Sequence, residues 1–255
     1  MSAIRYALED KVFVVTGGSR GIGFEIVKNL VDQGALVAFC GRKKENIEQA
    51  AQSLGTDPAR ILPHQAHIAK EDEVDGFFNA AMKAFGRVDA LINNVGMNLV
   101  TGSVADTDFA TWDKIISTNL HGTFLCSRKA AKIMKDQKKG KIVSISSIAA
   151  RRASPAMGIY GIAKAGIEML TRVLAAELAP FNIQVNAVAP SMVRTDFSKP
   201  FWSNKDIYDM VVKRIPMGRI AEPADVVHSV LFLSSEASDF ITGQTLLVDG
   251  GASVI

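Results

Sequence analysis

Short runs of β-branched and apolar residues alternate along the chain with longer segments whose apolar positions recur at helical spacing. The runs that predict strands are residues 12–16, 36–40, 90–93, 141–145, 183–187 and 245–248. The segments that predict helices are residues 23–31, 44–54, 112–134 and 160–178. Strands that are apolar on both faces are typical of a parallel sheet covered by helices on each side. The pattern therefore predicts a doubly wound α/β fold.

The 255 residues contain no linker rich in proline or serine, so one domain covering residues 1–255 is expected. One segment, residues 190–216, breaks the alternation and is rich in Ser, Lys, Phe and Met. We expect a long loop with short helices there. Because a loop of that length inside a compact domain usually carries function, we interpret residues 190–216 as a substrate-binding loop.

Composition and charge exclude several classes of protein. Hydrophobic residues make up 48% of the chain and charged residues 22%, which excludes a disordered or fibrous protein. The net charge of +3 is too small to indicate nucleic acid or an anionic membrane as the main partner. No apolar run reaches the ~20 residues of a membrane span, and the N-terminus lacks the apolar core of a signal peptide. A soluble, cytoplasmic protein is expected.

The two cysteines, Cys40 and Cys126, lie in apolar surroundings and lack the spacing of metal ligands. We expect both thiols to be free, which suits a reducing cytoplasm. No metal site is expected.

A glycine-rich turn lies directly between the first predicted strand and the first predicted helix, at residues 16–23. Glycines let the backbone turn tightly and approach a pyrophosphate, whose charge is met by backbone N–H groups and the positive end of the helix. An ordinary strand-to-helix turn is the alternative, but the strand, the glycine spacing and the amphipathic helix together indicate dinucleotide binding. The residues predicted to bind the cofactor here are Gly17, Ser19, Arg20, Gly21, Ile22 and Gly23.

The second predicted strand ends where NAD-binding folds usually carry an acid that binds the adenosine ribose. This chain has Gly41 there, followed by Arg42, Lys43 and Lys44. A carboxylate would repel a 2′-phosphate, whereas a guanidinium can bind it with two hydrogen bonds. Arg42 therefore favours NADP(H), with NAD(H) as the alternative cofactor. The basic run could also be only the solvated start of a helix.

Three side chains suited to acid–base chemistry follow in the second half of the chain. Ser147 follows a predicted strand, and Tyr160 lies four residues before Lys164, so the latter two share one face of the next helix. A free tyrosine has a pKa of ~10 and is a poor base near neutrality. A lysine cation ~4 Å away could lower that pKa to ~7. Each feature is common by itself, but together they predict a catalytic site.

The chain resembles the short-chain dehydrogenase/reductase family almost from end to end. The matching motifs are Thr16-Gly17-x-x-x-Gly21-Ile22-Gly23, Asn93-Asn94-x-Gly96, Asn119-x-x-Gly122, Ser147, Tyr160-x-x-x-Lys164, Pro190-x-x-x-x-Thr195 and Asp249-Gly250-Gly251. This resemblance implies a Rossmann-like fold and an enzyme that transfers a hydride between NADP(H) or NAD(H) and a ketone or secondary alcohol. It also implies a homotetramer or homodimer in which helices within residues 112–134 and 160–178 pair across subunits.

The same resemblance assigns roles to individual residues. Tyr160 would be the general acid/base, and Ser147 would hold the substrate oxygen. Lys164 would also bind the nicotinamide ribose, and Asn119 would hold a proton-relay water. Further cofactor contacts would come from His67, Ile68, Asn94, Gly96, Pro190, Val193 and Thr195.

Three positions depart from the family pattern. Val95 stands where the family usually has Ala, and Ser191 follows Pro190 where the family usually has Gly. Where the family usually has an Asp on the adenine amino group, this chain has His67 before Ile68. His67 either stacks on or hydrogen-bonds to adenine, or it only faces solvent. The backbone contact of Ile68 survives in both cases.

Cationic and large apolar side chains border the predicted crevice. They are Arg151, Arg152, Arg194, Met97, Met157, Met192, Phe197, Phe201 and Trp202. The arginines could meet an anionic tail of the substrate, and the others could cover an apolar or acyl group. Alternatively, the arginines are solvated or lie at a subunit interface, and the others pack in the core or a lid. We expect a small-molecule ketone or alcohol substrate; a 3-hydroxyacyl thioester substrate and a non-catalytic nucleotide-binding subunit are the alternatives.

Overall fold

A parallel sheet of seven strands runs through the computed structural model, which describes residues 6–153 and 156–254. The strands are β1 (Val12–Thr16), β2 (Leu36–Gly41), β3 (Ile61–Gln65), β4 (Ala90–Asn93), β5 (Gly140–Ile145), β6 (Ile183–Pro190) and β7 (Thr245–Val248). Their order across the sheet is β3-β2-β1-β4-β5-β6-β7, and every neighbouring pair is parallel. The chain crosses from β3 at one edge to β4 beside β1. Sheets of this kind bind ligands at that reversal, outside the carboxyl ends of the strands.

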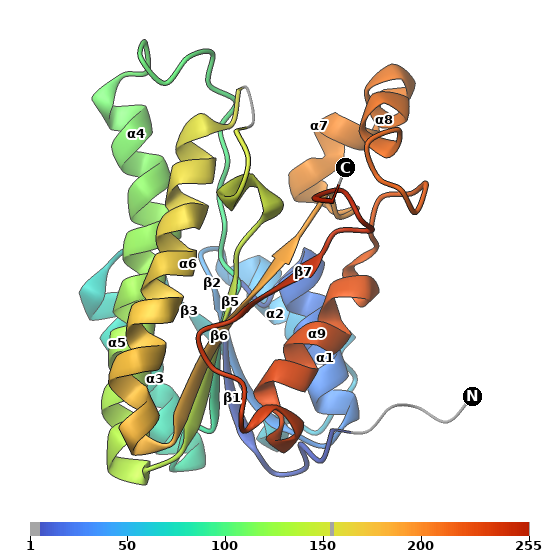
Figure 1. The fold of residues 1–255 in the computed structure, drawn as a ribbon. Coiled ribbons are helices and arrows are strands. Elements are labelled where there is room, and N and C mark those ends of the chain that lie inside the picture. Colours follow the sequence, from blue (N-terminus) through green and yellow to red (C-terminus); the bar gives the residue numbers. More distant parts are fainter. Residues whose placement is uncertain (1–5, 154–155, 255) are drawn as a thin grey trace.

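Helices cover both faces of the sheet (Figure 1). The helices on one face are α1 (Gly21–Asp32), α2 (Lys44–Ser53) and α9 (Pro223–Ser234), and those on the other are α3 (Glu71–Phe85), α4 (Phe109–Ile116), α5 (Gly122–Gln137) and α6 (Gly158–Leu178). Two short helices, α7 (Lys199–Trp202) and α8 (Lys205–Val212), stand beyond the carboxyl ends of the strands. The predicted doubly wound parallel sheet is therefore confirmed.

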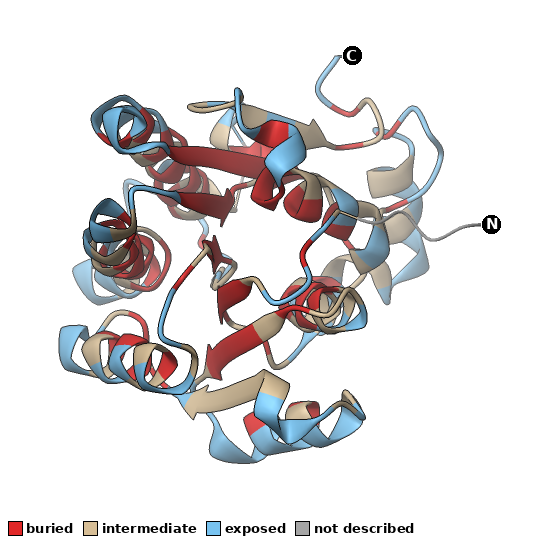
Figure 2. Ribbon diagram, turned by 90° about the horizontal axis from the view of Figure 1, so that it is seen from below, coloured by how far each residue is buried: buried red, intermediate tan, exposed pale blue. Residues whose placement is uncertain are grey.

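Two apolar cores fill the space between the sheet and its helix layers. All five residues of β1 are buried, and Figure 2 shows buried strands at the centre and helices exposed on their outer sides. Phe39 and Leu231 belong to the core on the side of α1 and α9, whereas Phe77 and Met134 belong to the core on the side of α3 and α5. The strands are apolar on both faces because both faces are covered.

The two cysteines are free and buried, as predicted. Burial raises the pKa of the Cys40 thiol to about 12 and the pKa of Cys126 well above its ordinary value, so neither thiol ionises near neutral pH. Within residues 6–153 and 156–254, no helix is both long enough and apolar enough to cross a membrane. The first five residues, on which the expectation about the N-terminus partly rests, lie outside the described residues.

The apolar pattern alone does not reveal β3, α3 and α9. β3 is a half-buried edge strand that contains Pro63, whose missing N–H is tolerated at an edge. α9 packs against both the sheet and α1, which removes the one-sided spacing of an amphipathic helix. The predicted helix 112–134 is divided, because a π-helical turn at Ser117–His121 separates α4 from α5. Residues 190–216 form the predicted loop with short helices.

Candidate active site

The glycine-rich turn leads from β1 into α1 in a shape that requires glycine. Gly17 and Gly21 have φ angles of +69° and +55°, in the left-handed region. A Cβ atom on Gly23 would lie 2.1 Å from the carbonyl oxygen of Gly17, which no side chain tolerates. Arg20 occupies the N-cap of α1 without a side-chain hydrogen bond to the helix. The first N–H groups of α1 therefore stay open to an anion, as a pyrophosphate site requires.

Asn94, directly after β4, holds this turn in place. Its Nδ2 donates to the carbonyl oxygens of Thr16 and Gly17 at 3.2 and 3.1 Å. Its backbone N–H donates to Thr16 Oγ1 at 3.0 Å. Val95 packs beside the turn, since its Cγ2 lies 3.1 Å from the place that a Cβ of Gly17 would take. The larger side chain at Val95 is thus accommodated because position 17 is glycine.

The segment after β6 lies against the glycine-rich turn. β6 ends at Pro190, and the buried Val193 pairs with Ala221 in a parallel bridge. Cγ2 of Thr195 lies 3.4 Å from the place that a Cβ of Gly21 would take. The structure therefore brings two predicted cofactor residues, Gly21 and Thr195, face to face although they are far apart in the sequence.

The corner at the end of β2 has an exposed guanidinium and lacks an acid. β2 ends at Gly41, and a Cβ atom there would lie 3.1 Å from the hydroxyl oxygen of Ser19. Arg42 is exposed, and its carbonyl oxygen accepts a hydrogen bond from Gln65 Nε2 at 3.0 Å, which holds its backbone. The Ser19 hydroxyl therefore lies beside Gly41, and the exposed Arg42 follows Gly41 in the chain.

His67 and Ile68, predicted on the adenine side, differ in their surroundings. His67 is half-buried, and its ring Nδ1 accepts a hydrogen bond from the backbone N–H of Ala69 at 3.2 Å, which ties the ring to its own turn. Ile68 is 3% exposed. Its Cδ1 lies 2.7 Å from the place that a Cβ of Gly122 would take, so the side chain packs inward. Any contact of Ile68 with a nucleotide would therefore come from its backbone.

Tyr160 and Lys164 lie one turn apart on α6, as their spacing predicts. Lys164 is 2% exposed, and its Nζ donates to the carbonyl oxygen of Ile145, the last residue of β5, at 2.8 Å. This Nζ lies 5.5 Å from the centre of the Tyr160 ring. Ser147, just past β5, lies close enough to Tyr160 to act on the pKa of its hydroxyl. The structure therefore brings the three predicted side chains together at the end of β5.

Burial sets the protonation of both titratable groups. It lowers the pKa of Lys164 to about 8, because the ammonium loses its hydration. It raises the pKa of Tyr160 to about 12, although the nearby Ser147 hydroxyl acts in the opposite direction. We expected the Lys164 ammonium to lower the pKa of Tyr160 to ~7, and for the chain without ligands this expectation is wrong. The ammonium is bound to the Ile145 carbonyl, and the effect of burial on the Tyr160 pKa is larger than the effect of this charge. At neutral pH Tyr160 is a proton donor.

Asn119 lies in the π-helical turn between α4 and α5 and accounts for it. Its Nδ2 donates to the carbonyl oxygen of Ile115 at 2.8 Å, so the side chain competes with the backbone for that acceptor and the helix widens. The same Nδ2 donates to the carbonyl oxygen of Met97 at 2.8 Å, and Oδ1 accepts from the Met97 N–H at 3.1 Å. The side chain of Asn119 is thus fixed by two segments.

Gly96 lies between the surface and two buried groups, the Lys164 ammonium and the Asn119 amide. It is exposed, and a Cβ atom on it would lie 3.5 Å from Lys164 Nζ and 3.6 Å from Asn119 Oδ1. A side chain at this position would cover both atoms. Glycine keeps the ammonium and the amide within reach of a ligand, which explains why position 96 belongs to the predicted cofactor set.

One buried charged group of the site is not found by reading the sequence. Glu168 is 5% exposed, and its carboxylate accepts from Ser146 Oγ and from Arg151 Nε, each at 3.2 Å. Ser146 precedes Ser147, and Glu168 lies one turn after Lys164, so these contacts tie the end of β5 to α6. The signal that could find Glu168 is its spacing, since it follows Lys164 by four residues on the same buried helix face.

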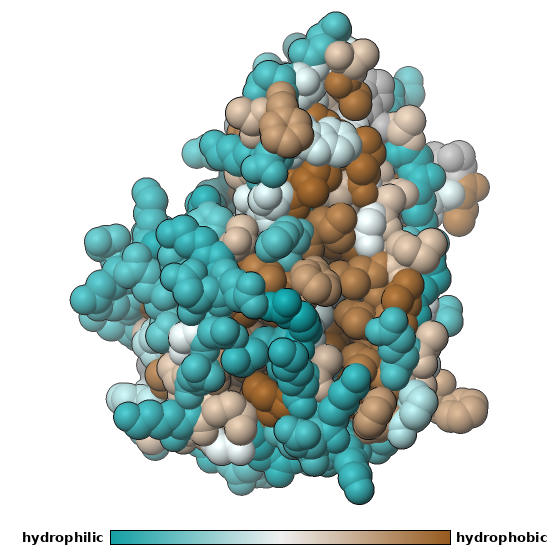
Figure 3. Space-filling model, turned by 90° about the vertical axis from the view of Figure 1, so that its left-hand side faces the viewer, coloured by the Kyte–Doolittle hydropathy of each residue, from teal (hydrophilic) through white to brown (hydrophobic). Residues whose placement is uncertain are grey.

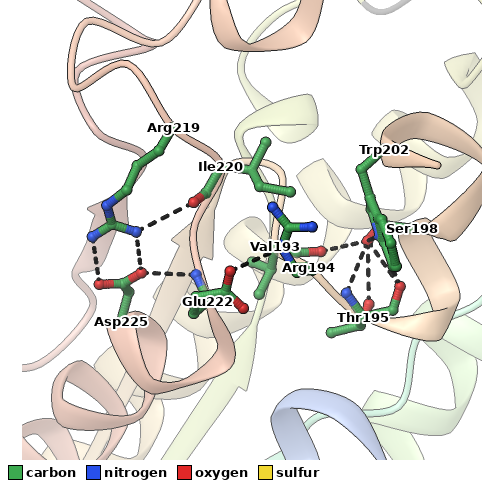
Figure 4. A network of polar contacts seen from close by, with 9 residues as sticks. All are labelled: Val193, Arg194, Thr195, Ser198, Trp202, Arg219, Ile220, Glu222 and Asp225. Carbon is green, nitrogen blue, oxygen red and sulfur yellow. Dashed lines mark hydrogen bonds and ion pairs between the residues drawn. The ribbon is translucent and has the colours of Figure 1, made fainter. Parts of the chain in front are cut away.

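The three arginines predicted near the crevice are engaged by the protein itself. Their partners are Glu168 for Arg151, the carbonyl oxygen of Ala252 for Arg152, and Glu222 with the Trp202 ring for Arg194 (Figure 4). Two of the three cations therefore face a carboxylate, which favours a structural role over a role in binding an anionic tail. Among the apolar residues, Phe197 has its ring centre 6.4 Å from that of Tyr160.

Comparisons with known proteins agree with this geometry. Residues 17–253 match the family model described as enoyl-(acyl carrier protein) reductase. Over 97% of its length the chain is 34% identical to dehydrogenase/reductase SDR family member 4 of Homo sapiens, of which it covers 89%. Over 96% of its length it is 37% identical to 3alpha-hydroxysteroid dehydrogenase of Mediterraneibacter gnavus, of which it covers 98%. A short-chain type dehydrogenase/reductase from Mycobacterium ulcerans matches with a TM-score of 0.94 at 30% identity, over 97% of this chain and 91% of that chain.

The glycine-rich turn and the group of Ser147, Tyr160 and Lys164 agree with these matches, which indicate an NAD(P)-dependent oxidoreductase. Within that class, the matches over nearly the whole chain are decisive: the protein belongs to the short-chain dehydrogenase/reductase family.

Proposed function

We propose that the protein transfers a hydride between NADP(H) and an apolar ketone or its secondary alcohol. The observation that carries the proposal is the group formed by the buried Lys164 and the half-buried Tyr160 and Ser147, with the exposed Gly96 next to the Lys164 ammonium. Burying the Lys164 ammonium costs roughly 3 kcal/mol of folding free energy. Because Lys164 would also bind the nicotinamide ribose, this cost alone fits nucleotide binding; the place of Lys164 and Ser147 beside Tyr160 is what favours a catalytic role.

In this proposal the substrate oxygen lies between the hydroxyl groups of Ser147 and Tyr160. A nicotinamide ring bound beside it supplies the hydride for reduction and takes it up for oxidation. Tyr160, protonated at neutral pH, donates its proton to the substrate oxygen during reduction. The Lys164 ammonium stabilises the phenolate that remains. A free lone pair on Asn119 Oδ1 would hold the water that returns the proton.

The residues around the crevice fit NADP(H). The glycine-rich turn and α1 would hold the pyrophosphate, and the backbone near Val193 with the Thr195 side chain would hold the nicotinamide carboxamide. Preference for the 2′-phosphate is supported at the end of β2, where Gly41 replaces an acid, the Ser19 hydroxyl lies beside Gly41 and Arg42 follows it. NAD(H) is the alternative cofactor.

Two observations support an uncharged apolar substrate. Arg151, Arg152 and Arg194 are already bound by groups of the protein, and an apolar cluster lies in and next to α7 and α8. The apolar cluster there includes Ile148, Met192, Trp202 and Tyr208. The similarity to a 3alpha-hydroxysteroid dehydrogenase also supports an apolar secondary alcohol. A 3-hydroxyacyl thioester is the second candidate, and it is supported by the similarity to the enoyl-(acyl carrier protein) reductase model.

We also propose that residues 1–255 form one domain, that residues 190–216 bind the substrate, and that two or four copies associate through α4, α5 and α6. Large apolar side chains are exposed on these helices, namely Phe109, Phe124, Ile162, Met169 and Val173. Figure 3 shows apolar side chains gathered over part of the side on which α4 and α5 lie. Apolar surface of this extent is typical of an interface. A cytoplasmic location is supported by the two free, buried thiols.

Steady-state assays test the central proposal. Each of NADPH, NADH, NADP⁺ and NAD⁺ is combined with a panel of ketones, secondary alcohols and 3-oxoacyl or 3-hydroxyacyl thioesters. Turnover of apolar ketones with NADPH is expected, with thioesters slower than free ketones. Tyr160→Phe should lower kcat at least about 100-fold, since it removes the proton donor.

Tyr6→Phe is the matched control, because Tyr6 lies beside His228 on α9, away from the crevice, and should keep parental activity. Full activity in Tyr160→Phe, or no turnover with any nucleotide and substrate class, would refute the proposal.

A further inference from the structure

Ser198 is a buried hydroxyl that the proposed chemistry does not use. It is 4% exposed and ends the short turn between Thr195 and α7. Its Oγ lies within hydrogen-bond distance of the Val193 carbonyl oxygen, of the Thr195 N–H and of the Trp202 indole N–H (Figure 4). We refer to residues 196–220, which contain α7 and α8, as the lid. One oxygen atom thus joins the segment after β6 to the first helix of the lid.

The hydrogen-bonding capacity of Ser198 is filled by these three groups. A serine hydroxyl has one proton to donate and two lone pairs that accept. The proton goes to the carbonyl oxygen of Val193, which is the nearest acceptor. The lone pairs accept from the Thr195 N–H at 3.2 Å and from the Trp202 indole N–H at 3.1 Å. The Thr195 side chain accepts the Ser198 backbone N–H in a capping box, and its hydroxyl, 3.4 Å from Ser198 Oγ, keeps its own proton for a ligand.

Trp202 reaches Thr195 a second time and is itself held from the other side. Its indole N–H also lies 3.1 Å from the carbonyl oxygen of Thr195. Its ring lies 5.1 Å from the guanidinium of Arg194, which pairs with Glu222 at the start of α9 at 2.9 Å (Figure 4). Helix α7 therefore cannot move without moving the backbone of Thr195 or breaking these contacts.

We infer that Ser198 and Trp202 are positioning residues for the nucleotide. Through them, the position of α7 determines the position of the Thr195 side chain, which faces Gly21. The inference rests on the proposed function, because it needs a dinucleotide between Gly21 and Thr195. Its consequence is reciprocal. A substrate that holds the lid down strengthens nucleotide binding, and a bound nucleotide holds the lid by the same factor.

Nucleotide affinity without substrate tests this coupling. The parent, Ser198→Ala and Trp202→Phe are each titrated with NADPH and with NADH by calorimetry. Both variants should bind the preferred nucleotide about five- to tenfold more weakly, the effect of one lost hydrogen bond. Trp202→Phe keeps an aromatic ring over Arg194 and loses only the N–H donor, so it provides the answer even where Ser198→Ala fails to fold.

Two matched controls separate positioning from general damage. Ser234→Ala removes a buried hydroxyl that donates to Val230 within α9, and Trp112→Phe changes the other tryptophan, in α4. Both should bind the nucleotide within about twofold of the parent.

The emission of Trp202 gives a signal that a merely structural Ser198 would not change. In the Trp112→Phe background Trp202 is the only tryptophan. Saturation with the oxidised form of the preferred nucleotide should shift its emission maximum. The shift should become smaller when Ser198→Ala is added, because Thr195 and Trp202 then keep only their direct hydrogen bond.

Each result decides the inference. Affinities of Ser198→Ala and Trp202→Phe within about twofold of the parent overturn it and leave the proposed function standing. Equal losses in the control variants also overturn it. A parent that binds neither NADPH nor NADH overturns the proposed function and the inference together.

Discussion

Lys164 brings a positive charge into the protein interior, where burial lowers its pKa from 10.5 to about 8. Below pH 8 the side chain is charged in the folded and in the unfolded chain, so the full cost of burying the ammonium is present. Between pH 8 and 10.5 the folded protein loses this proton first, and the cost disappears. The residue therefore lowers the stability of the protein at neutral pH in exchange for a cation beside Tyr160.

Lys164→Met should raise the free energy of unfolding at pH 7 by about 1–2 kcal/mol. The roughly 3 kcal/mol cost of the buried ammonium is removed, while the hydrogen bond to Ile145, worth about 1 kcal/mol, is lost. Urea unfolding at pH 7 and pH 10 measures the change, which should shrink at the higher pH. Activity should be lost in the same variant. Lys28→Met on α1 is the exposed control, and a Lys164→Met variant less stable than the parent at pH 7 would contradict this account.

Arg42→Ala tests the choice of nucleotide at the residue scale. Loss of a guanidinium on the 2′-phosphate should raise the KM for NADPH about tenfold or more and leave the KM for NADH within about twofold. Steady-state kinetics with both nucleotides measure the ratio. Lys44→Ala is the control, because Lys44 pairs with Glu48 within α2. Equal changes for the two nucleotides would contradict an NADP(H) assignment.

Secondary-structure elements could be predicted where local pattern and burial coincide. The bounds of β1, β4 and β7 follow directly from short apolar runs. The apolar residues of β1 and β4 face both helix layers, and those of β7 face one helix layer and the lid. β3 escapes because an edge strand is half-buried. The π-helical turn at Asn119 could not be predicted for a different reason: the side chain that competes for the Ile115 carbonyl is fixed by hydrogen bonds to Met97, a residue distant in the sequence.

The site residues divide in the same way. Tyr160 and Lys164 can be placed together from spacing on one helix. The contact of Glu168 with Ser146 joins α6 to the end of β5, and that of Ser198 with Trp202 depends on the path of the lid, so neither follows from local pattern. The pKa of Tyr160 also needs the structure, because burial outweighs the nearby charge.

At the scale of the whole molecule, one edge of the sheet carries both halves of the proposed site. The glycine-rich turn and Arg42, which we propose to hold the nucleotide, follow β1 and β2, and the proposed acid–base group lies at the end of β5 (Figure 1). The lid stands above that same edge. Helices α4 to α6 cover one flank and leave apolar side chains in solvent, which is why we place the contact between subunits there.

The double substitution Met169→Glu and Val173→Glu should convert the oligomer into monomers. These side chains are 54% and 45% exposed on α6, and carboxylates there would be buried without partners in an interface. Size-exclusion chromatography with light scattering measures the mass. Lys28→Glu on α1 should leave the parental mass unchanged. A parent that is already monomeric, or a double variant of unchanged mass, would contradict the proposed interface.

The burial of Cys40 and Cys126 makes the natural chain suitable for site-specific labelling. These are its only cysteines, and their raised pKa values keep both thiols unreactive near neutral pH. A cysteine introduced in place of the exposed Lys205, at the start of α8, would then be the single site open to a maleimide. Spin labels or fluorophores could therefore follow the lid during turnover without any other change to the sequence.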